Sequence, residues 1–253
     1  MATVEEVTAK YGNFLIRVLP AGVGVCAVCR TVVTGDWSRC YQCNNHRSCL
    51  SYTADAVASV ALSAKGGQWA YELSAYKNSP SLSARNTLGI GLSAVLWRWL
   101  DGHEDCVRRA AGVASFPIVT SIPSTGGRLE HPLPGMLSNI VGPTMNRYVE
   151  LLQANPKYAP GMREAHDDRF TIRTRFNGEP VLVIDDQWTS GGRAQSAASG
   201  LRLAGSGPVA VVEFGRHFDL HPQRIEYRAA AENYYQAAHA QTWDWHKCCL
   251  ELS

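Results

Sequence analysis

Residues 181–193 read VLVIDDQWTSGGR, and this stretch decides the fold class. Its first four residues are apolar, as is typical of a short β-strand buried on both faces of a sheet. Two carboxylates, Asp185 and Asp186, follow at once, and a Thr-Ser-Gly-Gly segment then leads into a helical pattern over residues 194–203. A strand that continues through a polar, glycine-rich loop into a helix predicts an α/β protein with a parallel sheet.

Segments on either side of this stretch support the same fold. Residues 116–122 and 209–214 are apolar runs that predict two more buried strands, and residues 170–176 alternate as a further strand does. Periodic apolar residues, or runs of Ala and aromatic residues, predict helices within three segments: 52–76, 84–110 and 134–152. With 253 residues, the chain has room for one Rossmann-like parallel sheet and a small additional module.

The loop over residues 189–192 suits a phosphate group. Gly191 and Gly192 let the backbone approach an anion closely. Thr189 and Ser190 carry hydroxyl donors where a helix N-cap belongs, and the first free amides of the helix face the same point. The acidic pair before the loop can accept hydrogen bonds from a vicinal diol or hold hydrated Mg²⁺. These residues point to a ribose 5-phosphate; the plainer alternative is a strand end followed by an ordinary helix cap.

This order of residues resembles the signature of the type I phosphoribosyltransferases. The resemblance implies that the chain binds phosphoribosyl pyrophosphate with Mg²⁺ and transfers the phosphoribosyl group to a nitrogen acceptor, releasing pyrophosphate. It implies that Asp185 and Asp186 hold the ribose hydroxyls. Arg193 stands where the family usually has a small hydroxyl residue, so it either adds a phosphate contact or points to solvent. Four loop residues would hold the 5-phosphate: Thr189, Ser190, Gly191 and Gly192.

The resemblance also implies roles for segments outside the signature. Tyr76-Lys77 lies where the family has a Tyr-Lys segment. The loop after the predicted strand 116–122 lies where the family cradles pyrophosphate, although a surface turn is an equal alternative. That loop supplies Ser124, Thr125 and Arg128. A basic lid and an acceptor-facing loop are further expectations, with a solvated strand face and a plain loop as alternatives. The residues concerned are Arg169, Arg173, Arg175, His217 and Asp219.

Four cysteines near the N-terminus predict a metal site. Cys26-x-x-Cys29 and Cys40-x-x-Cys43 are two CxxC pairs separated by ten residues. Each pair forms a tight knuckle, and two knuckles complete the tetrahedron of a structural Zn²⁺ site. The alternative is a set of incidental cysteines or a redox pair. A zinc module ahead of a phosphoribosyltransferase domain resembles the ComF family of competence-associated proteins and amidophosphoribosyltransferase-like proteins.

The two modules allow two hypotheses about activity. We expect a zinc-binding module in residues 1–55 and a phosphoribosyltransferase-like domain in residues 56–253. The first hypothesis is an enzyme, and the second is a non-catalytic ComF-like regulatory protein whose zinc module docks a protein or a nucleic acid. Arg30, Arg39 and Arg47 lie near the cysteines and allow the second hypothesis. The chain begins Met-Ala, without the N-terminal cysteine of glutamine-hydrolysing relatives, so we expect no glutamine-dependent activity. A homodimer is compatible with either hypothesis.

Composition sets the remaining expectations. The chain has 24 basic and 22 acidic residues, a balance that does not favour non-specific nucleic-acid binding. Neither a signal peptide nor a membrane-spanning run is evident, so we expect a cytoplasmic protein without a membrane partner, in which paired cysteines bind metal. For residues 243–249 (WDWHKCC) we expect packing of the tail onto the domain. A metal contact through His246 or a base-stacking surface is the alternative for this run.

Overall fold

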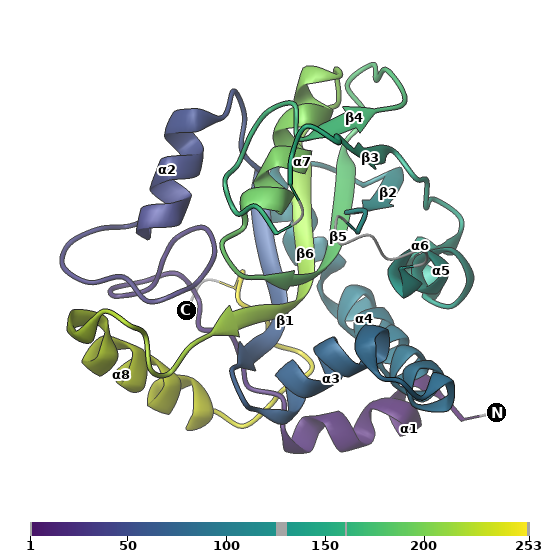
Figure 1. Cartoon of the computed structure of the whole chain (residues 1–253). Coiled ribbons are helices and arrows are strands. Elements are labelled where there is room, and N and C mark those ends of the chain that lie inside the picture. The colour runs from purple at the N-terminus through teal and green to yellow at the C-terminus, as the bar shows by residue number, and fades with distance from the viewer. Residues whose placement is uncertain (1, 125–130, 160, 252–253) are drawn as a thin grey trace.

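A four-stranded parallel sheet forms the centre of the molecule (Figure 1). The structure is a computed structural model that describes residues 2–124, 131–159 and 161–251. Every pairing in the strand order β1-β6-β5-β2 is parallel, which confirms the α/β class predicted from the sequence. The strands are β1 (Ala56–Ala64), β2 (Ile118–Ser121), β5 (Val181–Trp188) and β6 (Val209–Phe218).

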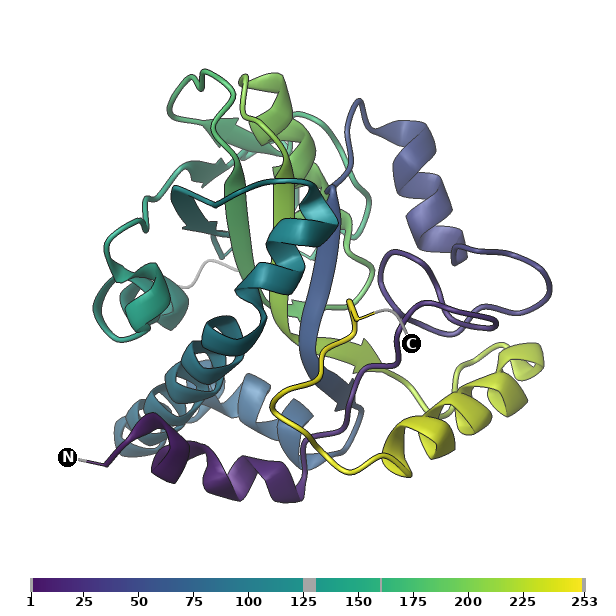
Figure 2. The ribbon, with the colours of Figure 1, turned by 180° about the vertical axis from the view of Figure 1, so that it is seen from behind.

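Helices cover both faces of this sheet (Figures 1 and 2). Helices α3 (Gln68–Asn78) and α4 (Leu82–Ala111) pack on one face, and α7 (Gly192–Leu203) packs on the other. The chain crosses the sheet in one direction from β1 to β2 and returns from β5 to β6. Because crossovers between parallel strands are right-handed, opposite directions place their helices on opposite faces. The carboxyl ends of the strands share one edge, where open α/β sheets bind ligands.

The two faces have separate apolar cores. Leu182 and Ile184 of β5 belong to the core under α3 and α4, whereas Val181 and Val183 belong to the core under α7. Three of the N-terminal cysteines also pack into the α7 core. The cysteine segment, residues 26–43, therefore lies directly against the sheet. The remaining elements are α1 (Val4–Thr8), η1 (Ala9–Asn13), α2 (Tyr41–Cys49), α5 (Pro132–Asn139), α6 (Gly142–Met145), β3 (Leu152–Ala154), β4 (Phe170–Ile172), η2 (Ile225–Tyr227) and α8 (Arg228–His239).

Strand β1 corrects the helix expected within residues 52–76. Residues 56–64 read AVASVALSA and form a nine-residue strand that is buried throughout, and the helix of this region, α3, begins only at Gln68. Small side chains have little intrinsic strand preference, which is why the sequence suggested a helix. The structure uses them because α3 and α4 pack on this strand. Tertiary packing has therefore overridden local propensity.

Other boundaries also differ from the expectation. The helix expected over residues 134–152 is two short helices, α5 and α6, followed by β3. Gly142-Pro143 opens the second helix, since proline begins a helix readily but cannot continue one. Strands β5 and β6 each extend four residues beyond the apolar runs at 181–184 and 209–214. Within the described part of the chain, no helix is long and apolar enough to cross a bilayer.

Candidate functional site

The acidic pair lies inside strand β5, because the strand continues to Trp188. The expected loop is therefore shorter, and it leads into α7 with Gly191 as the N-cap residue, at φ +81°. The sequence predicted a hydroxyl residue at this cap. The structure corrects this prediction, because the cap residue is Gly191, which has no side chain. Ser190 contributes nearby, since its Oγ accepts a hydrogen bond of 3.4 Å from the amide of Gly192. Thr189 is exposed to solvent beside it.

Both glycines of the loop are required by their surroundings. A Cβ on Gly191 would lie 2.1 Å from the Trp188 ring, and the positive φ already disfavours any other residue. A Cβ on Gly192 would lie 2.0 Å from the carbonyl oxygen of Arg163. The backbone of the loop is thus held closely between the end of β5 and a second chain segment around residue 163. The first amides of α7 face this narrow space.

Asp185 and Asp186 point to opposite faces of the sheet. Side chains alternate along a strand, so Asp186 continues the row of Leu182 and Ile184 toward α3 and α4. Asp185 continues the row of Val181 and Val183 toward α7. Both carboxylates are buried. One strand therefore presents a carboxylate to each of two different environments.

Asp186 meets the Tyr-Lys segment of α3. Lys77 forms an ion pair with Asp186 Oδ2, and the Tyr76 hydroxyl donates to the same oxygen at 3.2 Å. His131, the N-cap residue of α5, places Nε2 at 3.7 Å from that oxygen. Burial alone would raise the pKa of Asp186, but His131 and the Lys77 charge outweigh it and hold that pKa well below its usual value. The carboxylate is therefore ionised in a nearly dry environment.

Asp185 has the opposite electrostatic character. Burial raises its pKa to about 6, the Arg193 charge opposes this rise, and the neighbouring Asp186 adds to it. Glu213 lies beside Asp185 on β6, in direct register with it, and is fully buried. Neither Glu213 oxygen has a hydrogen-bond partner among the described residues, and burial followed by the Asp185 charge raises the pKa of Glu213 far above normal. Asp185, Glu213, Ser190 and Arg193 line a pocket of about 200 Å³ over the loop.

Arg193 does not point to solvent. Its guanidinium donates to the carbonyl of Pro123 at 2.6 Å and so joins the start of α7 to the loop after β2. This is the loop expected to cradle pyrophosphate. Ser124 is half-buried next to that contact, whereas Thr125 and Arg128 lie outside the described residues. The two loops of the candidate site are therefore adjacent at the carboxyl edge of the sheet.

The residues expected to form a basic lid have different positions. Arg169 is buried and donates to the carbonyls of Met162 and Glu164. These hydrogen bonds hold residues 161–165 over the loop of residues 189–192, which we call the signature loop. Arg173 and Arg175 lie at the surface, where Arg173 contacts Gln153. Arg163 lines the small pocket, so it is the cation of this region nearest the loop. Arg169 positions that segment rather than projecting into the pocket.

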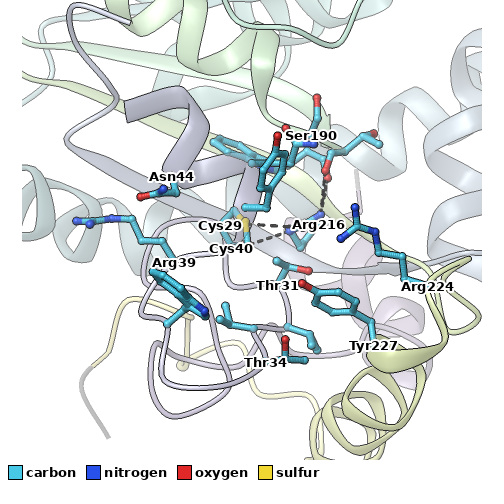
Figure 3. Close-up of a pocket in the computed structure, with 17 residues that line it drawn as sticks. Cys29, Thr31, Thr34, Arg39, Cys40, Asn44, Ser190, Arg216, Arg224 and Tyr227 are labelled. Carbon is cyan, nitrogen blue, oxygen red and sulfur yellow. Dashed lines mark hydrogen bonds between the residues drawn. The ribbon is translucent and has the colours of Figure 1, made fainter. Parts of the chain in front are cut away.

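A cleft of about 610 Å³ lies between the signature loop and the cysteine segment (Figure 3). Its lining combines aromatic rings with hydrogen-bonding groups, including Trp188, Ser190, Arg39, Arg224 and Tyr227. Arg216 closes the base of the cleft, where it donates to the carbonyls of Cys29 at 2.8 Å and Trp188 at 2.9 Å. The cysteine segment and the signature loop are thus connected through one buried guanidinium.

The segment 216–219 was expected to follow the strand as a loop, and the structure corrects this. Strand β6 continues to Phe218, so Arg216 and His217 are strand residues. Asp219 follows the strand and forms an exposed ion pair with Lys65 at 3.6 Å. Of these residues, Arg216 is the one that reaches the cleft.

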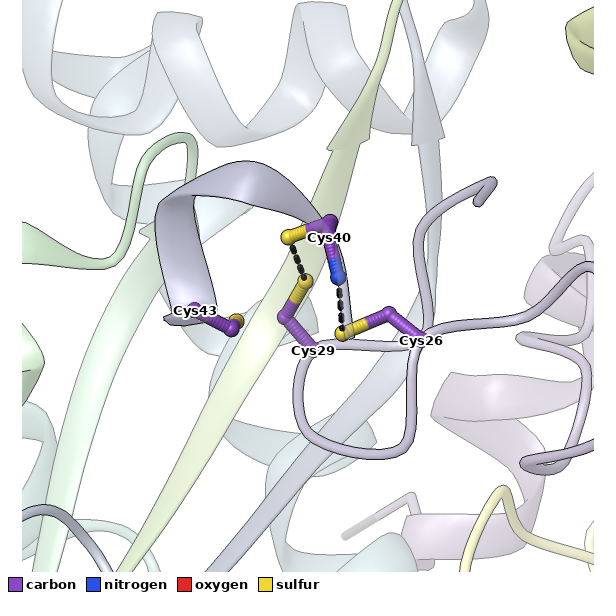
Figure 4. Close-up of side chains that lie close together, drawn as sticks. All are labelled: Cys26, Cys29, Cys40 and Cys43. Atoms are coloured by element: carbon purple, nitrogen blue, oxygen red, sulfur yellow. Dashed lines mark hydrogen bonds between the residues drawn. The ribbon is translucent and has the colours of Figure 1, made fainter. Parts of the chain in front are cut away.

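Cys26, Cys29, Cys40 and Cys43 form one cluster, as their spacing predicts (Figure 4). Their four sulfurs lie within 4.8 Å of one another, and the Cys29 and Cys40 sulfurs are 3.6 Å apart. The backbone amide of Cys40 donates to Cys26 Sγ at 3.3 Å. Hydrogen bonding with Cys29, and then with the other thiols, lowers the pKa of Cys26 far below its usual value, which favours a thiolate. The cluster is consistent with a four-thiolate zinc site, which is typically structural.

The arginines near the cysteines differ in their availability to a partner. Arg30 adopts a positive φ of 58° in the first knuckle, and its buried side chain donates inward, to Val28 and Cys249 carbonyls among others. It is therefore not free to contact another molecule. Arg39 is half-buried at the cleft, and Arg47 is exposed on α2.

Several residues of the site were missed at the level of sequence, among them Glu213, His131, Arg216 and Arg163. Glu213 had a detectable signal, because a carboxylate within the apolar run VAVVEF cannot reach solvent from a strand buried on both faces. His131 had none, since its contact with Asp186 spans 55 residues of sequence. The inward role of Arg216 became visible only when β6 proved longer than its apolar run.

Comparisons with known proteins add no family assignment: no family model, curated protein or solved structure matches the chain. The function must therefore be argued from the chemistry of the site itself.

Proposed function

We propose that this chain is a phosphoribosyltransferase-like protein. It binds phosphoribosyl pyrophosphate with Mg²⁺ and transfers the phosphoribosyl group to a nitrogen acceptor with release of pyrophosphate. One observation carries the proposal: the buried pair Asp185–Asp186 lies in the last four residues of parallel strand β5, and a short loop then leads to Gly191 and Gly192 at the start of α7. This combination brings carboxylates and helix amides to the same edge of the sheet.

The loop supplies the phosphate end of the site. Gly191 and Gly192 line the pocket at the N-terminus of a 12-residue helix, where the helix dipole favours an anion. Ser190 adds a hydroxyl, and Arg163 and Arg193 add positive charge around the same pocket. These groups suit the 5-phosphate of a ribose.

The carboxylates suit the ribose hydroxyls and a divalent cation. Asp185 and Glu213 are neighbours in register, and Glu213 has two buried oxygens without a hydrogen-bond partner among the described residues. A set of buried oxygen donors of this kind fits hydrated Mg²⁺, which usually keeps several waters and takes one or two carboxylates. When bound, Mg²⁺ would neutralise charge on the pyrophosphate leaving group.

Basic side chains near Asp186 suit the leaving group. Lys77 and His131 both contact Asp186 and both line an open cavity of about 1020 Å³ together with Arg85. In the transfer, the bond from ribose C1 to pyrophosphate breaks and pyrophosphate leaves with the electron pair. A bond from the acceptor nitrogen to C1 forms, and the nitrogen loses a proton. The chain would position the reactants and screen charge, so the reaction needs no covalent nucleophile.

The cleft between the loop and the cysteine segment suits the acceptor. Trp188 and Tyr227 provide aromatic surface, while Asn44 and Thr31 provide hydrogen-bonding groups beside Ser190. A planar nitrogen base fits such a lining, because aromatic rings stack on its face and polar side chains read its edge. The cysteine cluster would then shape the acceptor side without entering the chemistry.

A non-catalytic binding protein is the second candidate. The observation in its favour is that Asp186 already has Tyr76, Lys77 and His131 as partners, and Arg193 already spans to Pro123. Such a site can retain the sugar phosphate without turnover. Under this candidate, the exposed residues of the cysteine segment and of α2, such as Trp37 and Arg47, would contact a protein or nucleic acid.

The test is pyrophosphate release from phosphoribosyl pyrophosphate and Mg²⁺ with a panel of purine, pyrimidine and amine acceptors, together with calorimetric binding. We expect binding in the wild type, release with at least one acceptor, and loss of both in Asp185→Asn/Asp186→Asn. The matched control is Asp105→Asn, an exposed carboxylate on α4. Binding without release for every acceptor would favour the second candidate. Equal behaviour of the double variant and the wild type would contradict both.

A further inference from the structure

A second group of metal-binding side chains joins α4 to the C-terminal tail. Helix α4 contributes His103 and Cys106, and the tail contributes Cys248 and Glu251. The ligand atoms, namely one imidazole nitrogen, two sulfurs and one carboxylate oxygen, all lie within 4.8 Å of one another. Residues three apart on a helix share a face, which explains why His103 and Cys106 can point at one centre. The tail runs along the side of the sheet that α4 covers (Figure 2).

His103 is oriented as a ligand. Its Nε2 lies 2.9 Å from the carbonyl oxygen of Trp245. A carbonyl can only accept, so Nε2 carries the proton and, in the neutral ring, Nδ1 keeps a free lone pair. Nδ1 is buried, makes no hydrogen bond with any described residue, and lies 3.8 Å from Glu251 Oε1. A histidine that donates from one nitrogen to a carbonyl and offers the other to the centre has the usual arrangement of a metal ligand.

Neighbouring groups also fix the positions of the other proposed ligands. Cys248 is buried, and its backbone amide donates to Glu251 Oε1 at 3.1 Å, which turns that carboxylate toward the group. Arg109 donates to Cys106 Sγ at 3.3 Å, which fixes the position of that sulfur on the helix. Purely apolar packing of the tail would require neither the free imidazole nitrogen nor the converging carboxylate.

We propose that His103, Cys106, Cys248 and Glu251 bind a Zn²⁺ ion distinct from that of the four-cysteine cluster, and that this ion fastens the C-terminal tail to α4. Mixed nitrogen, sulfur and oxygen ligands suit Zn²⁺ in a tetrahedral site. Bond lengths of about 2.0–2.3 Å would place the ligand atoms roughly 3.3–3.8 Å apart, so closure requires shifts of about 1 Å. The sequence offered a metal contact through His246 only as the alternative to packing of the tail, and His246 is exposed and outside the group.

The ion would also influence the N-terminal cluster. Arg30, in the first knuckle, donates to the carbonyl of Cys249 at 3.2 Å, one residue from the proposed ligand Cys248. Fixing the tail therefore fixes a hydrogen-bond acceptor of the knuckle.

The test is the number of zinc ions per full-length chain, measured by native mass spectrometry and elemental analysis after purification with Zn²⁺. We expect two ions in the wild type, one in Cys248→Ser, and two in the control Cys49→Ser, an exposed cysteine outside both groups. One ion in both the wild type and Cys248→Ser would overturn the proposal, as would two ions in Cys248→Ser. Loss of the Cys106 and Cys248 thiols to a disulfide in the native protein would overturn it as well.

Glu251→Gln keeps the test decisive if the cysteine variant does not fold. Glu251 is partly exposed, so the change should be tolerated. We expect one of the two ions to transfer to a chelator at least about tenfold more readily, while the other is unchanged. With Co²⁺ in place of zinc, the wild type should show two sulfur-to-metal absorption components, and Glu251→Gln should alter one alone. Identical transfer and spectra in both proteins would contradict the proposal.

Discussion

The two faces of the sheet treat neighbouring carboxylates in opposite ways. On the face covered by α3, Asp186 has a lysine, a tyrosine and a histidine around one oxygen, and its pKa is lowered. On the face covered by α7, Asp185 sits beside Glu213 and lines the same pocket as Arg193, and its pKa is raised. The strand pleat alone separates these environments.

This difference indicates that the two carboxylates of the acidic pair have different roles. The charge of ionised Asp186 is already balanced by fixed partners, so this residue holds Lys77 and His131 in position. The Asp185 face gathers two buried carboxyl groups, Asp185 and Glu213, whose raised pKa values mean that ionisation is disfavoured there, so it is the side that gains most from an added cation or diol. An acidic pair read from sequence as one feature is therefore two half-sites.

The largest expected effect comes from removing the cation on the Asp186 face. Lys77→Met leaves a buried carboxylate without its ion-pair partner, and we expect a loss of about 3 kcal/mol in the free energy of unfolding at pH 7. The penalty should shrink at low pH, because the unpaired Asp186 then takes up a proton. Urea unfolding followed by circular dichroism measures both effects.

Lys65→Met is the matched control for this change. Lys65 pairs with Asp219 at 3.6 Å on the surface, and exposed ion pairs contribute at most about 1 kcal/mol. Equal losses for the two lysine variants would mean that the Asp186 face is not the specialised environment described above.

A smaller effect is expected from filling the space beside Gly192 on the other face. In Gly192→Ala the new Cβ would meet the backbone carbonyl of Arg163 at 2.0 Å, so the segment over the loop must move. Overpacking of this kind costs about 2 kcal/mol, and we expect binding of phosphoribosyl pyrophosphate to be lost as well. Gly89→Ala in α4 has open space around it and should stabilise the chain by up to about 1 kcal/mol. Unchanged binding of phosphoribosyl pyrophosphate in Gly192→Ala would show that the loop is not part of the binding site.

The sequence was sufficient for features that depend on local pattern. Strand β5, helix α7 and the two CxxC knuckles each consist of adjacent residues whose spacing has a direct geometric meaning. Their positions follow from strand alternation, helical periodicity and ligand spacing.

Features that depend on distant contacts were not predictable in this way. Strand β1 has the composition of a helix and is a strand only because of what packs on it. The partners of Asp186 come from α3 and α5, and the group around His103 joins residues 145 positions apart along the chain. Such contacts carry no local signature, so a single sequence gives no means of pairing them.

The smallest expected effect concerns Asp185 and depends on pH. Its pKa of about 6 exceeds the value near 3.8 of an unburied carboxyl, so between those values the folded chain binds the proton more tightly than the unfolded chain. Stability therefore falls as pH rises through this window, and Asp185→Asn should remove that loss. We expect the variant to be about 1 kcal/mol more stable than the wild type at pH 7.5, within a limit of about 3 kcal/mol for a shift of this size. The advantage should vanish below about pH 4.

Asp168→Asn is the control of opposite sign. A hydrogen bond from Tyr158 lowers the pKa of Asp168, so loss of this carboxylate should slightly weaken the fold at neutral pH. A stability difference for Asp185→Asn that does not change with pH would show that both faces of the strand hold ionised carboxylates, and the contrast between them would then lie in their partners alone.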